Sequence, residues 1–253
     1  MGSAVVAFSG GVDSTFLLNT AIDVLKNNVL AVIASSQTYP SKELEEAKAT
    51  ARSLGAKFIV IQTDELKNPE FCNNPKERCY YCKSELFSRL KEIAFENKIK
   101  YVVDGSNVDD NNDFRPGRKA AKEFGVRSPL MESGFTKKDI RRMSKKIGLS
   151  TWDKPSLACL ASRIPYGTKI EFSTLNQIND GENFIRDLGF NQVRVRHHGS
   201  IARIELEKND ISRIFDGDIL DLISDKFKKL GYNYVTVDIE GFRSGSMNEV
   251  LNI

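Results

Sequence analysis

The sequence predicts an α/β protein, with a Rossmann-like parallel sheet followed by a small α+β domain. Along the first part of the chain, short apolar runs typical of buried strands alternate with amphipathic segments typical of helices. Such alternation implies parallel strands joined by right-handed crossovers. From residue 173 onward two strand-like runs follow one another directly, as in a hairpin. We therefore expect one domain over residues 1–167 and a second over residues 168–253.

Composition and charge exclude several classes of protein. The 253 residues have an ordinary globular composition, and a net charge of +3 is too small to argue for a nucleic-acid partner. No apolar run is long enough to span a bilayer, and the N-terminus lacks the features of an export signal. We expect a cytoplasmic protein without a membrane partner. In a reducing cytosol the four cysteines would be metal ligands, reactive thiols or core residues rather than disulfides.

The first strand is expected at residues 4–8, and a glycine-rich turn and a helix follow it. Backbone N–H groups and the helix dipole favour an anion at such a turn. Glycines let the backbone approach the anion without an intervening Cβ, and hydroxyls add donors. The turn lacks the ending of a Walker P-loop and is not GxGxxG. The expected binding residues of this loop are Ser9, Gly10, Gly11, Asp13 and Ser14.

Three further strands and four helices complete the expected first domain. The strands are at residues 29–34, 58–61 and 101–104, and the helices at residues 41–55, 83–97, 119–124 and 137–147. Ser35 and Gly105 follow the second and fourth strands, at the sheet edge where open α/β sheets bind ligands, so we expect nucleotide contacts there. Asp110 is placed to hold Mg²⁺. A solvated Asn/Asp turn is the alternative.

A CxxC pair, Cys79 and Cys82, lies at the junction between a polar loop and a helix. The helix dipole, Arg78 and Lys83 would favour thiolates at this position. One CxxC leaves three interpretations open, namely half a zinc site, a redox pair or two separate thiols.

The second part of the chain carries two further candidate sites. A loop at residues 152–167 combines Cys159 and Arg163 with other polar residues, and loops host chemistry more often than cores do; a linker with one buried cysteine is the alternative. Arg194 and Arg196 alternate with valines on an expected strand and so share one face. Two adjacent guanidinium groups form a site for a phosphate, although a solvated strand face is equally compatible with the pattern.

Several longer motifs occur in a fixed order along nearly the whole chain. They are residues 9–14 (SGGVDS), 109–117, 152–155 (WDKP), 158–167 (ACLASRIPYG), 193–199 (VRVRHHG) and 241–248 (GFRSGSMN). Together they resemble the LarE-type ATP-dependent sulfur transferases, which belong to the PP-loop ATP pyrophosphatases and act in nickel-pincer nucleotide synthesis. The resemblance implies a loop that binds ATP and releases pyrophosphate.

The resemblance also implies a substrate, pyridinium-3,5-biscarboxylic acid mononucleotide, whose carboxylate is adenylated before sulfur replaces AMP. The chemistry is consistent, because a free carboxylate is a poor acyl donor and AMP is a good leaving group. The phosphate loop and Mg²⁺ would neutralise charge on the departing pyrophosphate. Arg194 and Arg196 would hold the phosphate of the substrate. Asp13, Lys83, Cys159 and Arg163 are the expected catalytic residues.

The sulfur source differs between branches of this family. In one branch the cysteine matching Cys159 gives up its own sulfur and becomes dehydroalanine. In the other, three thiolates hold a [4Fe–4S] cluster whose fourth iron is open to hydrosulfide from a sulfide donor. We favour the cluster, with Cys79, Cys82 and Cys159 as ligands and Cys72 as a bystander. Zn²⁺ is the main competitor for the same thiolates.

Rival functions follow from the same loop. A tRNA thiolase would need a broad basic surface or an RNA-binding module, so we do not expect nucleic acid as a partner. A synthetase that uses ammonia would not need the cysteines, and a nucleotide sensor would bind ATP without releasing pyrophosphate. The family resemblance further implies a homo-oligomer.

Overall fold

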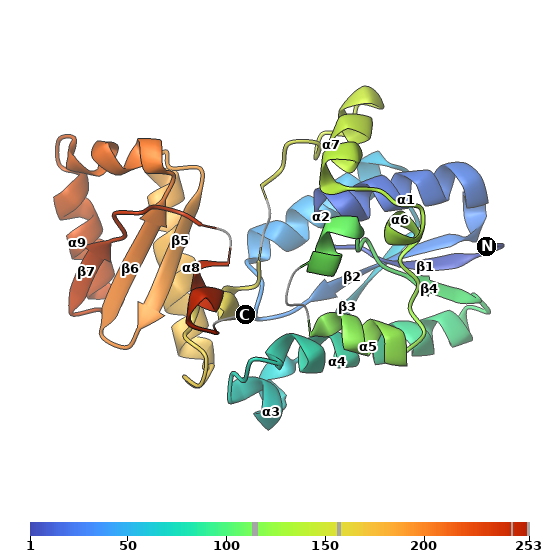
Figure 1. Ribbon diagram of the computed structural model, residues 1–253, viewed down its shortest axis with the longest axis horizontal. Coiled ribbons are helices and arrows are strands. Elements are labelled where there is room, and N and C mark those ends of the chain that lie inside the picture. The colour runs from blue at the N-terminus through green and yellow to red at the C-terminus, as the bar shows by residue number, and fades with distance from the viewer. Residues whose placement is uncertain (113–115, 156–157, 244, 252–253) are drawn as a thin grey trace. The chain divides into compact units, whose positions relative to one another are not determined.

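The computed structural model describes residues 1–112, 116–155, 158–243 and 245–251 (Figure 1). The chain packs as two units. The first comprises Met1–Phe71 and Lys76–Leu157, and the second Cys72–Pro75 and Ala158–Ile253. This division at 157/158 precedes the expected domain boundary at 167/168. The buried ion pair between Arg163 and Glu182 explains the difference, because it holds the segment that begins at Ala158 in the second unit. Asn74 holds Cys72–Pro75 in the same unit, since its side chain donates to the carbonyls of Pro165 (2.8 Å) and Thr168 (3.1 Å).

The first unit contains a four-stranded parallel sheet, which confirms the expected Rossmann-like fold class. Its strands are β1 (Ala4–Ala7), β2 (Val29–Ser35), β3 (Phe58–Gln62) and β4 (Tyr101–Val103), in the order β3-β2-β1-β4. In this register Val5 of β1 lies opposite both Leu30 and Val102. The carboxyl ends of β1 and β4 are therefore neighbours, which brings the loops that follow them together.

Helices cover both faces of this sheet. They are α1 (Val12–Leu25), α2 (Ser41–Ser53), α3 (Pro69–Cys72), α4 (Arg78–Glu96), α5 (Gly117–Glu123), α6 (Pro129–Glu132) and α7 (Lys137–Lys146), with short 3-10 turns η1 (Lys26–Asn28), η2 (Glu65–Lys67) and η3 (Val108–Asn112). Successive strand residues point to opposite faces, so Val6 packs with α1, α2 and α7 while Val5 packs with α4 and α5. Helix α4 begins at Arg78 rather than Lys83, so the CxxC pair lies within its first turns.

The second unit contains a three-stranded sheet in the order β5-β6-β7. Its elements are η4 (Leu160–Arg163), α8 (Phe172–Asp187), β5 (Val193–His198), β6 (Ile201–Leu206), η5 (Lys208–Phe215), α9 (Ile219–Lys229), β7 (Tyr234–Val237) and η6 (Ser246–Leu251). Strands β5 and β6 form the expected antiparallel hairpin, and β7 adds to β6 in parallel. Gly199 adopts a φ of +64° in the hairpin turn, which glycine does at low cost.

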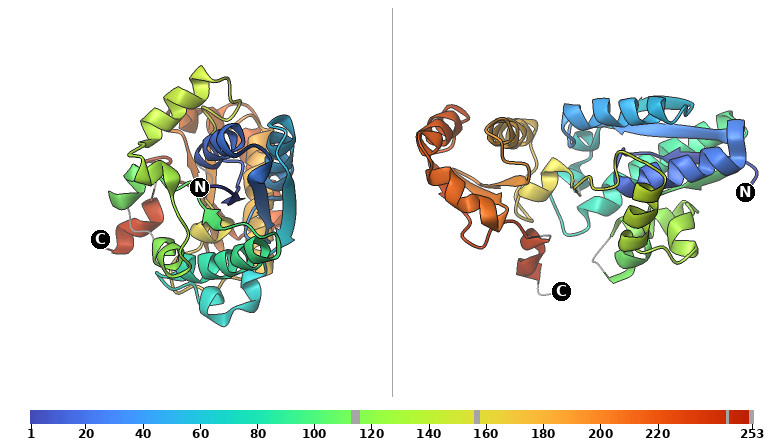
Figure 2. Two further views of the ribbon diagram at one scale, coloured as in Figure 1. Left: turned by 90° about the vertical axis from the view of Figure 1, so that its right-hand side faces the viewer. Right: turned by 90° about the horizontal axis from the view of Figure 1, so that it is seen from above.

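The two faces of this second sheet differ in polarity. One face carries Val195 and Ile204, and α8 and α9 lie on it (Figure 2, right). The packing there is close, since a Cβ on Gly181 of α8 would lie 2.9 Å from the Phe227 ring of α9. The other face carries Arg194 and Arg196 on β5, together with Arg203 and Glu205 opposite them on β6. Among the described residues, no helix has the length and apolar character needed to cross a membrane.

Candidate functional site: a phosphate loop and a buried arginine face

The phosphate loop joins β1 to α1 in the first unit. Helix α1 begins after Gly11, which has no side chain to cap it, so the amides of the first turn are available to an anion. The hydroxyls of Ser9 and Ser14 lie 3.1 Å apart, and the Ser9 amide donates to Ser14 Oγ at 3.3 Å. These hydrogen bonds close the loop on itself. The arrangement is the strand, glycine turn and helix that the sequence predicts for phosphate binding.

Two glycines are needed for this loop to pack. Gly10 has a φ of +71°, and a Cβ there would lie 2.9 Å from Cα of Ala47 in α2. Gly105 follows β4, and a Cβ on it would lie 3.0 Å from the amide nitrogen of Ser14. By contrast, a Cβ on Gly11 would meet only Ser9 Oγ, at 3.5 Å. The structure therefore brings Gly105, which the sequence places almost a hundred residues later, against the first turn of α1.

Asp13 and Lys137 form an ion pair at the edge of the loop. Both side chains are partly exposed, at 23% and 30%. The second oxygen of Asp13, Oδ1, is buried and has no hydrogen-bond partner among the described residues. An unpartnered carboxylate oxygen beside a phosphate loop is a suitable ligand for Mg²⁺. Lys137 begins the helix expected at residues 137–147, but its place beside the phosphate loop was not predicted. A capping box between Thr136 and Asp139 fixes the start of α7.

The carboxylates that follow β4 mostly hold their own loop together. Asp104 accepts hydrogen bonds from Ser106 and Ser128, and Asp109 accepts the Lys137 amide at 2.8 Å. Asp110 is buried and accepts the Asn107 amide at 2.9 Å. In the portions of the chain that the structure describes, no three His, Cys, Asp or Glu side chains converge as a metal site. The role of Asp110 as a Mg²⁺ ligand stays a prediction, and Arg115 of the motif at residues 109–117 lies outside the described residues.

A buried carboxylate that the sequence analysis missed lies beyond the ends of β2 and β3. Glu65 accepts hydrogen bonds from Ser36 Oγ at 2.5 Å and Thr63 Oγ1 at 3.1 Å, and the Cys82 thiol lies 3.6 Å from it. Ser35, the expected nucleotide contact, ends β2, and its carbonyl accepts the Thr63 amide. This edge of the sheet is thus polar, as ligand-binding edges of α/β sheets are.

None of the four cysteines is in a disulfide, and they belong to different units. Cys79 and Cys82 are three residues apart on α4, so they share one face of the helix. Cys159 precedes η4 in the second unit, to which Cys72 also belongs. The stem of Lys83 packs against Gly117, and its ammonium lies 5.5 Å from the centre of the Phe87 ring.

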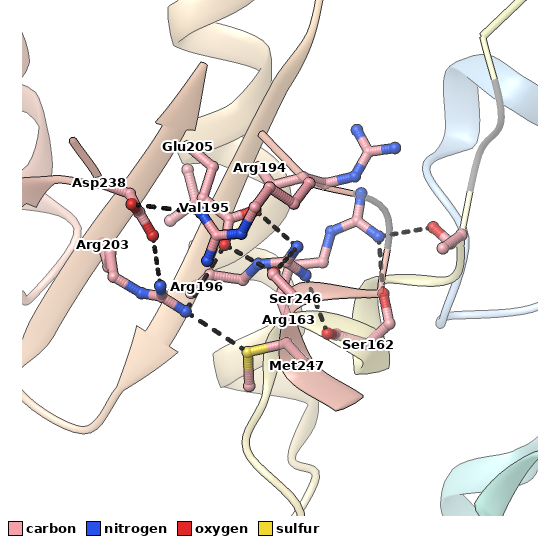
Figure 3. Close-up of polar contacts among 12 residues, drawn as sticks. Ser162, Arg163, Arg194, Val195, Arg196, Arg203, Glu205, Asp238, Ser246 and Met247 are labelled. Atoms are coloured by element: carbon pink, nitrogen blue, oxygen red, sulfur yellow. Dashed lines mark hydrogen bonds and ion pairs between the residues drawn. The ribbon is translucent and has the colours of Figure 1, made fainter. Parts of the chain in front are cut away.

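Arg194 and Arg196 lie on the polar face of the second sheet, and both are only 4% exposed (Figure 3). A solvated strand face, the alternative to an anion site, is therefore wrong. Arg196 donates to Glu205 at 2.6 Å and to Ser246 Oγ at 2.9 Å, while its Nε is buried without a partner among the described residues. Burial and the charge of neighbouring arginines, Arg163 foremost, lower the pKa of Arg194 to about 10. Positive charge is thus in excess here.

Arg163, expected to be catalytic, is almost completely buried in an ion pair with Glu182 of α8. Its Nε and Nη2 donate to the two carboxylate oxygens at 2.8 and 3.1 Å. Burial would raise the pKa of Glu182, but the charges of Arg163 and other arginines hold it at about 2. The structure gives Arg163 a tightly fixed position rather than an exposed one, and its role in catalysis stays a prediction.

Residues 241–243 and 245–248 complete the polar face, and Ser244 of this motif lies outside the described residues. The Phe242 amide donates to the carbonyl of Leu206, and the Phe242 ring lies 5.2 Å from the Arg194 guanidinium. Ser246 Oγ donates to Glu205 at 2.9 Å. Gly241 has a φ of +74°, and a Cβ on it would lie 2.8 Å from the Leu206 carbonyl oxygen, so the segment requires glycine where it meets the sheet.

Comparison with known proteins places this chain among well-defined relatives. The NAD synthase family model matches residues 1–111. An uncharacterized protein of Synechocystis is 44% identical over 98% of this chain and 92% of its own length. The pyridinium-3,5-bisthiocarboxylic acid mononucleotide synthase of Lactiplantibacillus plantarum is 42% identical over 97% of this chain and 89% of its own length.

Some more distant matches cover only part of the chain. The glutamine-dependent NAD(+) synthetase of Aquifex aeolicus is 34% identical, over 39% of this chain and 19% of its own length. The NAD synthase family model thus covers the phosphate loop but not the arginine face, by which we mean the polar sheet face with Arg194, Arg196, Arg203 and Glu205, whereas the full-length relatives cover nearly the whole chain. Since the full-length relatives match both units, the chain belongs to the LarE-type sulfur transferases, a family of ATP-dependent PP-loop enzymes.

Proposed function

We propose that this protein adenylates a carboxylate of a pyridinium mononucleotide, releases pyrophosphate, and then delivers sulfur to form a thiocarboxylate for nickel-pincer nucleotide synthesis. The substrate class follows from the named relative, which covers nearly the whole chain. The observation that carries the proposal is the phosphate loop with Asp13 and Lys137 at its edge, because it provides the groups that the activation step needs.

In the activation step, a substrate carboxylate oxygen attacks the α-phosphorus of ATP. The bond from that phosphorus to the bridging oxygen breaks, and pyrophosphate leaves with the electron pair. Amides of the first turn of α1 and the hydroxyls of Ser9 and Ser14 bind the phosphates. Lys137 exchanges its ion pair with Asp13 for a contact with the developing charge. Mg²⁺ bound through Asp13 would neutralise the same charge.

The arginine face would hold the phosphate of the mononucleotide. Its excess positive charge and the unpartnered Nε of Arg196 both support this role, since an anion would satisfy a buried donor that otherwise has none. We expect Arg194→Ala to raise KM for the mononucleotide about tenfold, as loss of one charge-assisted hydrogen bond does, and to leave KM for ATP unchanged. Equal changes in both KM values would place the phosphate site elsewhere.

For sulfur delivery, a [4Fe–4S] cluster would be held by Cys79, Cys82 and Cys159. Thiolates are the ligands such clusters prefer, and the CxxC pair on one face of α4 presents two of them together. A bound cluster would supply an open iron for hydrosulfide. The N-terminus of α4 would favour the thiolate forms of Cys79 and Cys82.

Iron and acid-labile sulfide should be measured on anaerobically purified protein, with Cys159→Ala and Cys72→Ser as a matched pair. About four irons per chain, lost in Cys159→Ala and retained in Cys72→Ser, would support the cluster. Absence of iron, with a loss of one H₂S from the protein mass after turnover, would mean that Cys159 is sacrificed. Zinc in place of iron would make the three cysteines a zinc site.

Asp13→Ala gives an independent test of the activation step. It should abolish pyrophosphate release that depends on the pyridinium carboxylate, while the iron content stays at the wild-type level. Normal turnover in this variant would contradict the assignment of the phosphate loop. A cytoplasmic location and a homo-oligomer stay predictions, and sulfide would come from a separate donor.

A further inference from the structure

Glu182 is a fully buried carboxylate that no part of the proposed chemistry uses. It lies in the middle of α8, on the helix face that also carries the buried Ile178 and Ile185. Four donors converge on its two oxygens. They are Arg163 Nε (2.8 Å) and Nη2 (3.1 Å), Arg186 Nη2 (2.7 Å) and the amide of Val195 (3.1 Å).

One of these donor residues, Arg163, also contacts the backbone of Cys159, the cysteine expected to act in sulfur delivery. The remaining nitrogen of Arg163, Nη1, donates to the carbonyl of Ala158 at 2.7 Å and to that of Cys159 at 3.1 Å. The Arg163 fork thus joins Glu182 on one side to the backbone of the Cys159 turn on the other. Because a guanidinium is planar and its donors are fixed in direction, holding it at two edges fixes the turn in orientation as well as in distance.

A second donor leads to the arginine face. Val195 is the residue of β5 between Arg194 and Arg196, and its amide is bound to Glu182. One carboxylate therefore fixes both the backbone that carries the cysteine and the strand that carries the two arginines. These contacts all lie within the second unit.

We propose that Glu182 is a positioning residue, which acts through Arg163 to hold the Cys159 turn in register with the arginine strand. The inference rests on the proposed function for the importance of Cys159, but the contacts themselves do not depend on it. A buried ion pair is weak evidence for stability, since apolar replacements are often as stable. A hydrogen-bonded ion pair can hold two functional segments in one geometry, whereas a pair of apolar side chains cannot.

The test measures amide hydrogen exchange in the Cys159 turn, residues 159–164, in the full-length protein. Glu182→Gln keeps the size of the side chain but removes its charge, and Arg163→Lys keeps a positive charge but loses the fork that reaches the carbonyls. Both should increase amide hydrogen exchange in peptides covering residues 159–164 by about tenfold, since charge-assisted hydrogen bonds that hold the turn closed are lost. Both should lower kcat, with KM for ATP unchanged.

Asp238→Asn is the matched control. It removes a carboxylate of the same unit from an ion pair with Arg203, and no hydrogen bond of Asp238 or Arg203 reaches the Cys159 turn among the described residues. Exchange at residues 159–164 should stay at the wild-type rate in this variant. If Glu182→Gln does not fold, Arg163→Lys carries the test alone.

Exchange within twofold of the wild type in the folded variants would overturn the proposal. Faster exchange throughout the second unit, rather than in the turn, would also overturn it, because that result means a general loss of stability. Since exchange requires no reaction, it distinguishes failure of this inference from failure of the proposed function.

Discussion

The phosphate loop and the arginine face both serve anions, and they are built in opposite ways. The loop uses consecutive residues, backbone amides and one ion pair, Asp13–Lys137, that water still reaches. The arginine face uses side chains from distant parts of the second unit, and its ion pair Arg196–Glu205 is almost completely buried, as is the neighbouring pair Arg163–Glu182. The two constructions should therefore respond differently to mutation.

The difference shows how each site controls charge. Backbone amides bind an anion without bringing a charge into the protein. In the absence of ATP the loop therefore has little positive charge that other groups must neutralise. Buried guanidinium groups bind more strongly but must be compensated when the anion is absent. Glu182 and Glu205 provide that compensation, but Nε of Arg196 stays buried without a partner among the described residues. An anion on the arginine face should therefore stabilise the second unit.

The largest contrast is expected in stability. Glu205→Ala leaves the buried Arg196 uncompensated and should destabilise the second unit by about 3–5 kcal/mol. Asp13→Ala removes a partly exposed pair and should cost less than about 1 kcal/mol. Urea unfolding followed by circular dichroism measures both losses of stability. The fluorescence of Trp152, the only tryptophan, reports on the first unit. Similar losses of unfolding free energy in the two variants would contradict the expected difference between the two sites.

Lowering the pH should destabilise the second unit through its buried carboxylate Glu182. The folded state holds the pKa of Glu182 at about 2, below its ordinary value of 4.5, so its ionised form contributes stability above pH 4.5. That contribution, roughly 3 kcal/mol, should be lost as the pH falls from about 4.5 to 2. The measurement is the urea midpoint against pH, compared between wild type and Glu182→Gln. A wild-type midpoint that falls no more steeply than that of the variant would contradict this prediction.

The same contrast explains which parts could be predicted from sequence. The phosphate loop is local, so its strand, glycine turn and helix follow from neighbouring residues. The shared face of Arg194 and Arg196 follows from alternation, but their burial does not. It depends on the hairpin register that places Glu205 opposite Arg194 and on Ser246, 50 positions after Arg196. Such pairings come from tertiary packing, which periodicity does not encode.

Two missed residues left weaker signals in the sequence. Lys137 begins an expected helix whose start a capping box also marks, but it lies 124 positions from Asp13, so no local pattern indicates that the two side chains pair. Glu182 occurs at helical spacing between Ile178 and Ile185, so it interrupts an otherwise apolar face. A charged residue at such a position indicates a buried ion pair, although not its partner.

The rate of pyrophosphate release should show which lysine acts at the phosphate loop. Lys137→Ala should reduce the rate of pyrophosphate release about a hundredfold, as loss of one preorganised donor to a developing charge does. Lys138 is the exposed neighbour on the same helix, and Lys138→Ala should leave the rate unchanged. Pre-steady-state release of pyrophosphate at saturating ATP measures the step. Equal rates in the two variants would exclude Lys137 from the activation step.

The smallest effect concerns the loop backbone itself. Gly10→Ala forces a Cβ into a positive φ and to 2.9 Å from the α2 backbone, so it should cost about 1–2 kcal/mol of stability. Gly11→Ala meets only Ser9 Oγ at 3.5 Å and should leave stability within about 0.5 kcal/mol. It should nevertheless weaken ATP binding, because its Cβ stands where the anion approaches the helix. Comparing thermal midpoints with nucleotide affinity separates the two roles. If Gly11→Ala bound ATP as the wild type does, the phosphates would have to approach from the other side of the loop, and Gly105 would become the residue that governs access.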